Sequence, residues 1–355
     1  MNPYLLLSDL HCHAWSAFSK VGPNGVNSRL QITLNEIERA VDHLLTQTTG
    51  NLVIIAGDLF HERGKIAPEV FNPTYATIER CVAKGAQFVM IPGNHDLAGK
   101  ETTELGNAMQ TLSALKGVQV ITKPEFIGYY GREIGLVPWV SSVKALKECC
   151  ADLGSNLLDA DKTDLIIHAG LNDVIMGLDH GLDATEVASW GFDRVFAGHY
   201  HHHKVFPGNQ VISIGATTQQ TWGDIDTHAG FLIVDEASVT YHASHAPSFV
   251  QIDETTDLDD LALIADGNYV RVRGLELAAA DMQQFRQELE NCGALGVSMQ
   301  SPVQLVQART GAVIKKTASL ETSVATYVEE QEFENAELVQ RACEDVLSTA
   351  RAKAA

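Results

Sequence analysis

Short apolar runs alternate along the chain with longer stretches in which apolar residues recur at helical spacing. The stretch 29–48 has this spacing. The stretch 68–84 begins with Pro68 and is followed by Gly85, as expected for a helix. The alternation, followed by a strand-rich second half, predicts an α/β (α+β) fold with a sheet core covered by helices. The predicted buried strands are 4–9, 51–58, 87–96, 164–170, 193–201, 209–217 and 229–235.

The pattern changes after the first 245 residues. The stretch 246–261, APSFVQIDETTDLDDL, is acidic and turn-rich and predicts a linker. The segments 269–274, 279–292 and 296–307 then predict a small strand–helix–strand module. The last segment, about 320–352, predicts one or two acidic helices. We therefore expect a large first domain, a small second domain and a helical tail.

Composition and net charge limit the classes of function that the chain can have. A net charge of −20 argues against a general nucleic-acid coat protein, because non-specific binding depends on Lys and Arg neutralising phosphates. It does not exclude a nuclease, because bound cations can reverse the local field. No apolar run reaches the roughly 18 residues of a membrane span. The start, MNPYLLLSDLH, lacks the basic region and cleavage site of a signal peptide, so we expect a cytoplasmic (intracellular) location.

Polar residues that can bind metal follow the predicted strands. Asp9 and His11 are two positions apart at one strand end, and side chains at such spacing point the same way in an extended backbone. Ligand sites in open α/β sheets lie beyond the carboxyl ends of the strands. The sequence therefore predicts one metal centre at one sheet edge. The candidate ligands are Asp9, His11, Asp58, Asn94, His168, His199 and His201.

Seven side chains exceed the usual ligand set of one cation. Two cations that share a bridging carboxylate fit better, and mixed imidazole and carboxylate donors suit manganese, iron or zinc rather than calcium. Such a pair, roughly 3.5–4 Å apart, can clamp the attacking and leaving oxygens of a phosphoester. Each motif alone has a plainer interpretation, since a lone Asp-x-His can simply cap a strand. Five predicted strand ends carry these donors in the order Asp9 and His11, Asp58, Asn94, His168, then His199 and His201. This combination favours the metal centre over the plainer interpretations.

The series D-x-H … GD … GNHD … H … GHxH resembles the calcineurin-like metallophosphoesterase superfamily over roughly residues 1–245. The resemblance implies a sandwich of two sheets flanked by helices, and two divalent ions, most commonly Mn²⁺. It implies that His95 faces the substrate as general acid or transition-state stabiliser. His202 and His203 have no role in it, and we expect exposed loop residues there. One metal would be held by Asp9, His11, Asp58 and His201, and the other by Asp58, Asn94, His168 and His199, with Asp58 bridging.

The second motif of this series reads GDLFH, whereas the phosphoprotein phosphatases have GDxxDRG. In GDLFH, His61 lies three residues after Asp58, where it could contact a phosphodiester. This motif, and the loop SIGATTQQTWGD at 213–224, resemble the SbcD-type DNA repair nuclease subunits. Members have a DNA-contacting cap and helices that grip a coiled-coil ATPase (SbcC), and they form homodimers. The implied domains are a nuclease domain at 1–245, a capping domain at 246–318 and a partner-binding tail at 319–355.

The candidate DNA-binding residues are few, and a solvated charged face explains them equally well. The tail carries Val324, Tyr327 and Val328 at helical spacing. This stripe indicates either core packing or a partner-binding helix, and the family layout favours the partner. The candidate DNA-binding residues are Arg271, Arg273, Lys315 and Lys316.

Our leading hypothesis is a two-metal, Mn-dependent DNA exonuclease/endonuclease, the nuclease subunit of an SbcCD-like complex in DNA repair, recombination or end processing. The alternative is a small-molecule phosphodiesterase or phosphatase of the same superfamily, which an acidic surface suits better. A third possibility is a scaffold whose metal site is structural. The complete ligand set and the intact His95 speak against this third reading.

Overall fold

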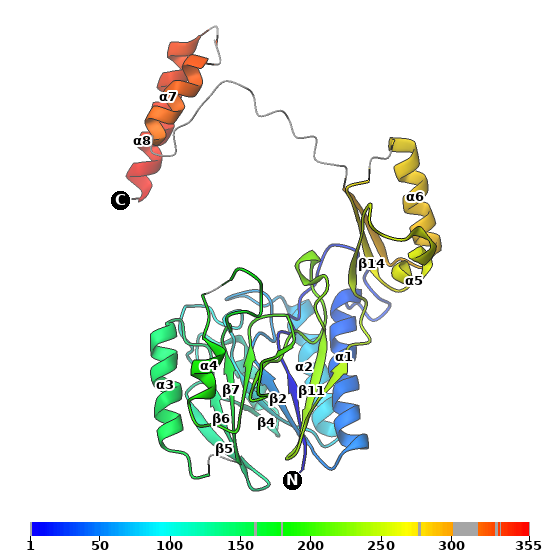
Figure 1. Ribbon diagram of the computed structural model, residues 1–355, viewed down its shortest axis with the longest axis vertical. Helices are drawn as coiled ribbons and strands as arrows, with labels where there is room; N and C mark the ends of the chain where they lie inside the picture. Colours follow the sequence, from blue (N-terminus) through cyan, green and yellow to red (C-terminus); the bar gives the residue numbers. More distant parts are fainter. Residues whose placement is uncertain are drawn as a thin grey trace. The chain divides into compact units, whose positions relative to one another are not determined.

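Two six-stranded sheets, stacked face to face, form the centre of the fold (Figure 1). In spatial order, the first sheet consists of β12 (Val239–Ala243), β11 (Gly230–Val234), β1 (Tyr4–Leu7), β2 (Leu52–Ala56), β3 (Gln87–Ile91) and β4 (Val118–Val120). The second consists of β5 (Glu125–Tyr129), β6 (Arg132–Val137), β7 (Thr163–His168), β8 (Arg194–Gly198), β10 (Val211–Ser213) and β9 (Lys204–Val205).

The computed structural model describes most of the chain, which forms two compact units, Met1–Gln300 and Ser301–Ala355. The described residues are 2–159, 162–178, 180–275, 278–300, 319–330, 333 and 335–354.

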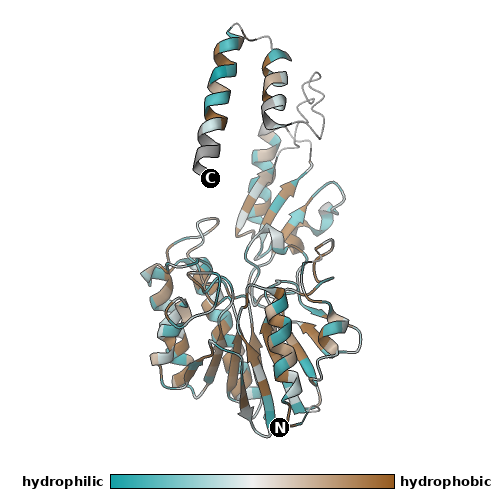
Figure 2. Ribbon diagram, turned by 90° about the vertical axis from the view of Figure 1, so that its left-hand side faces the viewer, coloured by the Kyte–Doolittle hydropathy of each residue, from teal (hydrophilic) through white to brown (hydrophobic). Residues whose placement is uncertain are grey.

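Side-chain alternation along the central strands explains the layers. In β1, Leu5 and Leu7 pack against the helices α1 (Ser28–Gln47) and α2 (Pro68–Ala83), whereas Tyr4 and Leu6 pack against the second sheet. Strands buried on both faces are apolar at every position, which Figure 2 shows as brown ribbons. The helices α3 (Val143–Ser155) and α4 (Ala184–Ala188) cover the other sheet (Figure 1). The predicted two-sheet α/β sandwich flanked by helices is therefore confirmed.

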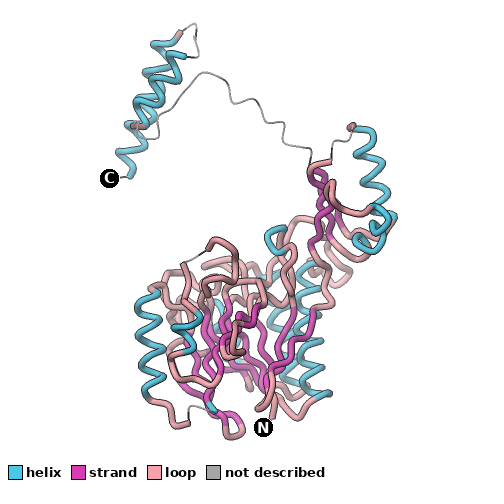
Figure 3. The backbone as a smooth tube through the Cα atoms, in the orientation of Figure 1, coloured by secondary structure: helices cyan, strands magenta, loops and turns pink. Residues whose placement is uncertain are grey.

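Parallel pairing brings several strand ends to one edge. The strands β1, β2 and β3 are parallel neighbours in the first sheet, and β7 and β8 are parallel neighbours in the second. Their carboxyl ends all run into loops, drawn pink in Figure 3. The strands β4, β5 and β6 were not predicted. β4 and β5 are sheet-edge strands with half-exposed positions, so their apolar pattern is weak.

A third sheet forms a small domain within the first unit. Its three parallel strands are accompanied by two helices, and its buried core includes Ile252, Val272 and Leu289. The prediction of a linker at 246–261 is wrong, because Phe249 and Ile252 are buried strand residues. The elements are β13 (Phe249–Ile252), α5 (Leu261–Ala265), β14 (Tyr269–Arg273), α6 (Ala279–Asn291) and β15 (Gly296–Gln300).

Aromatic side chains join the small domain to the two-sheet core, and we call this cluster the aromatic junction. The Phe18 and Tyr269 rings stack with centroids 5.6 Å apart, and Trp222 meets Phe249 edge-on at 4.9 Å. The guanidinium of Arg29 lies 5.1 Å from the Phe249 ring and 5.4 Å from the Tyr269 ring. The aromatic junction consists of Trp15, Phe18, Arg29, Trp222, Phe249 and Tyr269.

The described residues of the second unit form the helices α7 (Leu320–Glu330) and α8 (Ala336–Ala354), which pack on each other through apolar residues such as Val324 and Val339. Among the described residues, no helix combines the length and the apolar character that crossing a bilayer requires.

Candidate metal centre

All seven predicted ligands lie at the edge where the parallel strands end. Asp9 and His11 follow β1, Asp58 follows β2, Asn94 follows β3, and His168 is the last residue of β7. His199 and His201 follow β8. At four of these positions the backbone has a positive φ, which non-glycine residues rarely adopt and which concentrates at functional sites. These values are 50° at Asp9, 44° at His11, 53° at Asp58 and 101° at His199.

Asp9, His11 and His201 form the first group of converging donors, with one atom of each within 4.8 Å of the others. The Nε2 atoms of His11 and His201 are 3.1 Å apart, and Asp9 Oδ1 lies 3.9 Å from His11 Nε2. Two imidazole nitrogens and a carboxylate oxygen therefore point toward one small volume.

Asp58, His168 and His199 form the second group, by the same criterion of 4.8 Å. His168 Nε2 lies 3.4 Å from Asp58 Oδ2. Asn94 Oδ1 lies between the two histidines, 3.3 Å from His168 Nε2 and 2.9 Å from His199 Nδ1. The structure thus divides the predicted ligands into the two sets that the family resemblance implies.

Asp58 lies between the two groups. Its Oδ2 is 3.8 Å from His11 Nε2 in the first group and 3.4 Å from His168 Nε2 in the second. Its Oδ1 accepts a hydrogen bond from the backbone N–H of His95 at 2.8 Å. The carboxylate is therefore held in a position from which it can bridge two cations.

Hydrogen bonds set the tautomers of two histidines. His168 Nδ1 donates to the Ala56 carbonyl at 2.7 Å, and His201 Nδ1 donates to Asp224 Oδ1 at 2.6 Å. Because Nδ1 is the donor in both rings, each Nε2 is the nitrogen that faces the centre and can bind a cation once it carries no proton, as metal-binding histidines require.

The donor set fits divalent cations. The buried Asp9 Oδ1 has no hydrogen-bond partner in the described part of the chain, although its Oδ2 accepts from Ser8 Oγ and from the His199 N–H. An unpartnered buried carboxylate oxygen is costly unless a cation or water satisfies it. Mixed nitrogen and oxygen donors suit manganese, iron or zinc. The centre has converging ligands for two such ions.

Charges within the centre shift the pKa values of its members. Burial raises the pKa of Asp9. Burial also opposes ionisation of Asp58, but the charge and hydrogen bond of His168 outweigh it and hold the Asp58 pKa well below its usual range. Burial lowers the pKa of His168, whereas the Asp58 carboxylate raises it, to about 9 in total. A cation bound here would take the place of the His168 proton, since a metal ligand must be deprotonated.

Glycines in the motifs allow the close approach of the ligands. A Cβ on Gly93 would collide with the Asp58 side chain, and one on Gly57 would collide with the His168 ring. Gly57 also has a φ of 94°, which L-residues with a side chain rarely adopt. These contacts explain why GD and GNHD carry a glycine immediately before the functional residues.

His95 and His61 lie beside the first group. Their rings stack with centroids 5.3 Å apart, and the His95 ring is 4.9 Å from that of His11. His95 Nδ1 donates to the His61 carbonyl at 2.6 Å, which leaves Nε2 as the free nitrogen. Burial and the neighbouring His95 and His13 lower the pKa of His61 to about 4, so its imidazole is neutral at pH 7.

Three residues at the centre were not predicted. The Trp139 ring lies 5.3 Å from the His199 ring and 6.1 Å from His168. Trp15 packs on His61 at 4.5 Å, and Asp224 bonds His201 as described above. None of them belongs to a strand-end motif, and the sequence places them far from the residues they contact.

The prediction that His202 and His203 are exposed is wrong. Both are half-buried. His203 Nδ1 donates to the Ser213 and Ile214 carbonyls, at 3.0 and 3.1 Å, and its ring stacks on Tyr241 at 4.8 Å. His203 is therefore a packing residue.

Two of the predicted DNA-binding residues, Arg271 and Arg273, belong to β14 of the small domain. The Arg271 guanidinium lies 5.2 Å from the Trp222 ring and donates to Gln251 Oε1 at 2.7 Å, and Arg273 is exposed. Lys315 and Lys316 lie outside the described residues. DNA binding by these side chains stays a prediction.

Comparison with known proteins identifies related sequences and folds. The family model "Calcineurin-like phosphoesterase" matches residues 3–203. The chain is 25% identical over 186 residues to "Exonuclease subunit 1" of Enterobacteria phage T4, covering 50% of this chain and 51% of that protein. The chain thus spans about half the length of this curated relative.

Solved structures of similar fold include a dimetal phosphatase from Danio rerio, with 9% identity, a TM-score of 0.41, and coverage of 68% of this chain and 98% of that one. Another is an archaeal phosphodiesterase, with 13% identity, a TM-score of 0.37, and coverage of 68% and 99%.

Proposed function

The chain belongs to the calcineurin-like phosphoesterase family, and on that premise we propose that it is a DNA exonuclease/endonuclease that uses two Mn²⁺ ions. We further propose that it is the nuclease subunit of an SbcCD-like complex with a coiled-coil ATPase, acting in DNA repair, recombination or end processing. The observation that carries the proposal is the pair of donor groups bridged by Asp58, with His95 and His61 beside them.

Two features favour DNA over a small phosphoester. The first is the similarity to a phage protein named as an exonuclease subunit. The second is the additional group formed by His11, His61 and His95, because His61 adds an imidazole beside the metal ligands. A neutral imidazole at this place can bond a phosphate oxygen of a strand that continues past the scissile bond.

In this mechanism Asp9, His11, Asp58 and His201 would hold one cation, and Asp58, Asn94, His168 and His199 would hold the other. When bound, such ions polarise phosphoryl oxygens and lower the pKa of water. The task of the protein is to fix these ligands, and the bonds from Ala56 and Asp224 to the histidines keep their Nε2 atoms oriented.

His95 is the proposed general acid. Its Nδ1 proton is committed to the His61 carbonyl, and its backbone N–H is bonded to Asp58, so ring and backbone are both fixed relative to the centre. A proton carried on Nε2 can then be given to the leaving 3′-oxygen of the cleaved strand. While it carries this proton, the same Nε2–H can also stabilise the transition state by donating a hydrogen bond to a phosphoryl oxygen.

The α7–α8 helices are the proposed docking element for the ATPase. They form an apolar groove of about 430 Å³, in which Leu338 is 71% exposed and Val346 is 67% exposed. Such a face suits a partner helix that inserts its own apolar residues. We also propose a homodimer, and DNA contact by the small domain. The lining residues are Val324, Leu338, Val339, Ala342, Cys343, Val346 and Leu347.

The test of the catalytic proposal compares substrates and metals. Full-length protein stripped with EDTA should cleave end-labelled linear duplex DNA after addition of Mn²⁺, and should leave cyclic nucleotides intact. His43→Ala, which removes a histidine of α1 that packs on Phe231 and His242 and belongs to none of the donor groups, is the matched control for His61→Ala. His61→Ala should lose DNA cleavage and retain hydrolysis of bis(4-nitrophenyl) phosphate. Turnover of cyclic nucleotides without cleavage of DNA would contradict the nuclease proposal.

The test of the partner proposal uses the full chain and a coiled-coil ATPase from the same genome. The double variant Leu338→Glu/Val346→Glu should abolish co-purification, because it places charge in the apolar groove. Leu263→Glu, at an exposed position of the small domain, is the control and should bind normally. Equal binding by both variants would argue against docking on the α7–α8 helices.

A further inference from the structure

His201 also makes a hydrogen bond to Asp224, a residue outside the metal-ligand motifs. Its Nδ1 donates to Asp224 Oδ1 at 2.6 Å, while its Nε2 points to His11 Nε2 in the first donor group. Asp224 is 4% exposed, so this bond is shielded from water. A carboxylate behind a histidine ligand fixes the tautomer and the orientation of the ring and increases the basicity of the metal-binding nitrogen.

The other oxygen of Asp224 is held by its own turn. Oδ2 accepts the backbone N–H groups of Gln220 and Thr221, at 2.8 and 2.7 Å. Thr221 Oγ1 in turn accepts the N–H of Gly223 at 3.2 Å, which closes a capping box on the short helix η3 (Trp222–Asp224). The carboxylate therefore has one oxygen fixed in the turn and the other aimed at His201.

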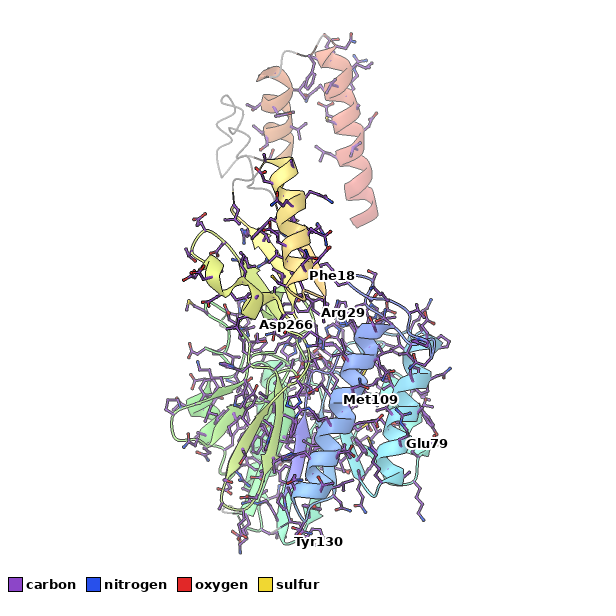
Figure 4. The ribbon with its side chains drawn as sticks, turned by 90° about the vertical axis from the view of Figure 1, so that its right-hand side faces the viewer. Phe18, Arg29, Glu79, Met109, Tyr130 and Asp266 are labelled. Atoms are coloured by element: carbon purple, nitrogen blue, oxygen red, sulfur yellow. The ribbon has the colours of Figure 1, made fainter. Side chains whose placement is uncertain are left out.

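The same turn is held against the small domain through Trp222. This ring meets Phe249 of β13 edge-on at 4.9 Å and Phe18 at 5.9 Å, and the Arg271 guanidinium of β14 lies 5.2 Å from it. Figure 4 labels Phe18 and Arg29 where α1 approaches the small domain. A single residue, Gly223, thus separates Trp222, which contacts the small domain, from Asp224, which bonds a ligand of the centre.

We propose that Asp224 is the positioning residue for His201, and that the small domain, through Trp222, holds the turn that carries this carboxylate. The inference rests on the two-metal centre of the proposed function. It adds a role for a residue outside the strand-end motifs and links the small domain to the affinity of one ion.

The first experiment measures Mn²⁺ binding to the metal-free full chain by isothermal titration calorimetry. In Asp224→Asn the amide cannot accept bonds on both sides, so either His201 or the turn loses its partner. One of the two ions should bind about 10–100-fold more weakly. Asp226→Asn is the matched control, because Asp226 is an exposed aspartate two positions away, and it should bind both ions as the wild type does.

A second readout separates positioning from loss of fold. Electron paramagnetic resonance at two equivalents of Mn²⁺ should show a strong spin-coupled signal in the wild type and mainly mononuclear Mn²⁺ in Asp224→Asn. Hydrolysis of bis(4-nitrophenyl) phosphate by Asp224→Asn should return as Mn²⁺ is raised. If Asp224→Asn fails to fold, as judged by circular dichroism, Asp224→Glu takes its place. Its displaced carboxylate should weaken the same ion.

The link to the small domain is tested with Trp222→Leu. This change removes the contact with Phe249 and keeps Asp224, so it should weaken the same ion by a smaller factor than Asp224→Asn does. Trp190→Leu, at a half-buried tryptophan packed on the second sheet beside α4, is the control and should leave both affinities unchanged. Equal affinities in Trp222→Leu and wild type would overturn this part of the proposal.

The outcomes distinguish this inference from the proposed function. If the wild type binds two ions and Asp224→Asn (or Asp224→Glu) binds them equally well, the positioning role is wrong and the metal centre stands. If the wild type binds no pair of ions, the proposed function itself is wrong.

Discussion

The metal centre and the aromatic junction both contain charged groups within the first unit, but they differ in how far neighbouring residues satisfy those groups. At the centre, Asp9 Oδ1 is buried without a hydrogen-bond partner, and the Nε2 atoms of His11 and His201 face each other at 3.1 Å. At the junction, the Arg29 cation is surrounded by aromatic rings and donates to the Gln220 and Ala17 carbonyls.

This difference indicates that the metal centre serves metal binding and that the aromatic junction serves the stability of the fold. The centre gathers donors that a bound cation would satisfy, whereas the junction already contains its own cation and its own acceptors. Substitutions at the centre should therefore affect metal binding and hydrolysis most strongly. Substitutions at the junction should affect stability most strongly.

The largest effect is expected for Asp58→Asn. It removes the carboxylate that lies between the two donor groups, and hydrolysis of bis(4-nitrophenyl) phosphate should fall about 10⁴-fold, since metal stabilisation of several kcal/mol is lost. Steady-state kinetics at saturating Mn²⁺ measures this. Activity within tenfold of the wild type would show that Asp58 does not bridge two ions.

A smaller loss is expected for His95→Ala. Removing a general acid should lower kcat for DNA cleavage about 10²–10³-fold. Both Mn²⁺ ions should still bind, because the side chain of His95 lies outside the two ligand groups. Kinetics and calorimetry on the same preparation check both statements, and weakened metal binding would reassign His95 to the ligand set.

At the junction, Arg29→Met should lower the free energy of unfolding by about 2–4 kcal/mol, because charged hydrogen bonds and cation–π contacts are lost. Urea denaturation of the metal-free protein measures this change. Hydrolysis at saturating Mn²⁺ should change less than about threefold, equivalent to under about 0.7 kcal/mol. If Arg29→Met lost as much hydrolysis as Asp58→Asn does, the aromatic junction would contribute to catalysis and the distinction between the two regions would be wrong.

The smallest effect is expected for His203→Gln, two positions after a proposed ligand. It should cost about 1 kcal/mol of stability, because the hydrogen bonds from Nδ1 to the Ser213 and Ile214 carbonyls are disturbed. Hydrolysis should be unchanged, whereas His201→Gln should lose it. If both variants lost hydrolysis to a similar extent, His203 would belong to the metal centre, contrary to the prediction.

Much of the centre was readable in advance. Family membership confirms the predicted metal-dependent phosphoesterase, and the donor set supports two divalent metals. The motifs predicted the site because the carboxyl ends of parallel strands lie at one edge of a sheet. Residues that follow these strands therefore lie close together even when they are far apart in the sequence. The assignment of individual side chains as metal ligands stays a prediction that the experiments above address.

Other features could not be read from local patterns. Phe249 lies in an acidic, turn-rich stretch and becomes a strand residue because Tyr269 and Trp222 cover it. Asp224 has no spacing relation to His201, and only the folding of the loop after β10 brings them to 2.6 Å.

The order of apolar strands and polar strand ends, by itself, predicted a sheet core covered by helices and the edge at which the donors meet, because side-chain alternation and the location of ligands beyond strand ends follow from local patterns. The arrangement of two stacked sheets was implied by the family resemblance of the motifs. Tertiary structure alone decided which histidine nitrogens face inward and how the small domain reaches the loop behind His201. Those outcomes depend on contacts between residues distant in sequence, which no local period encodes.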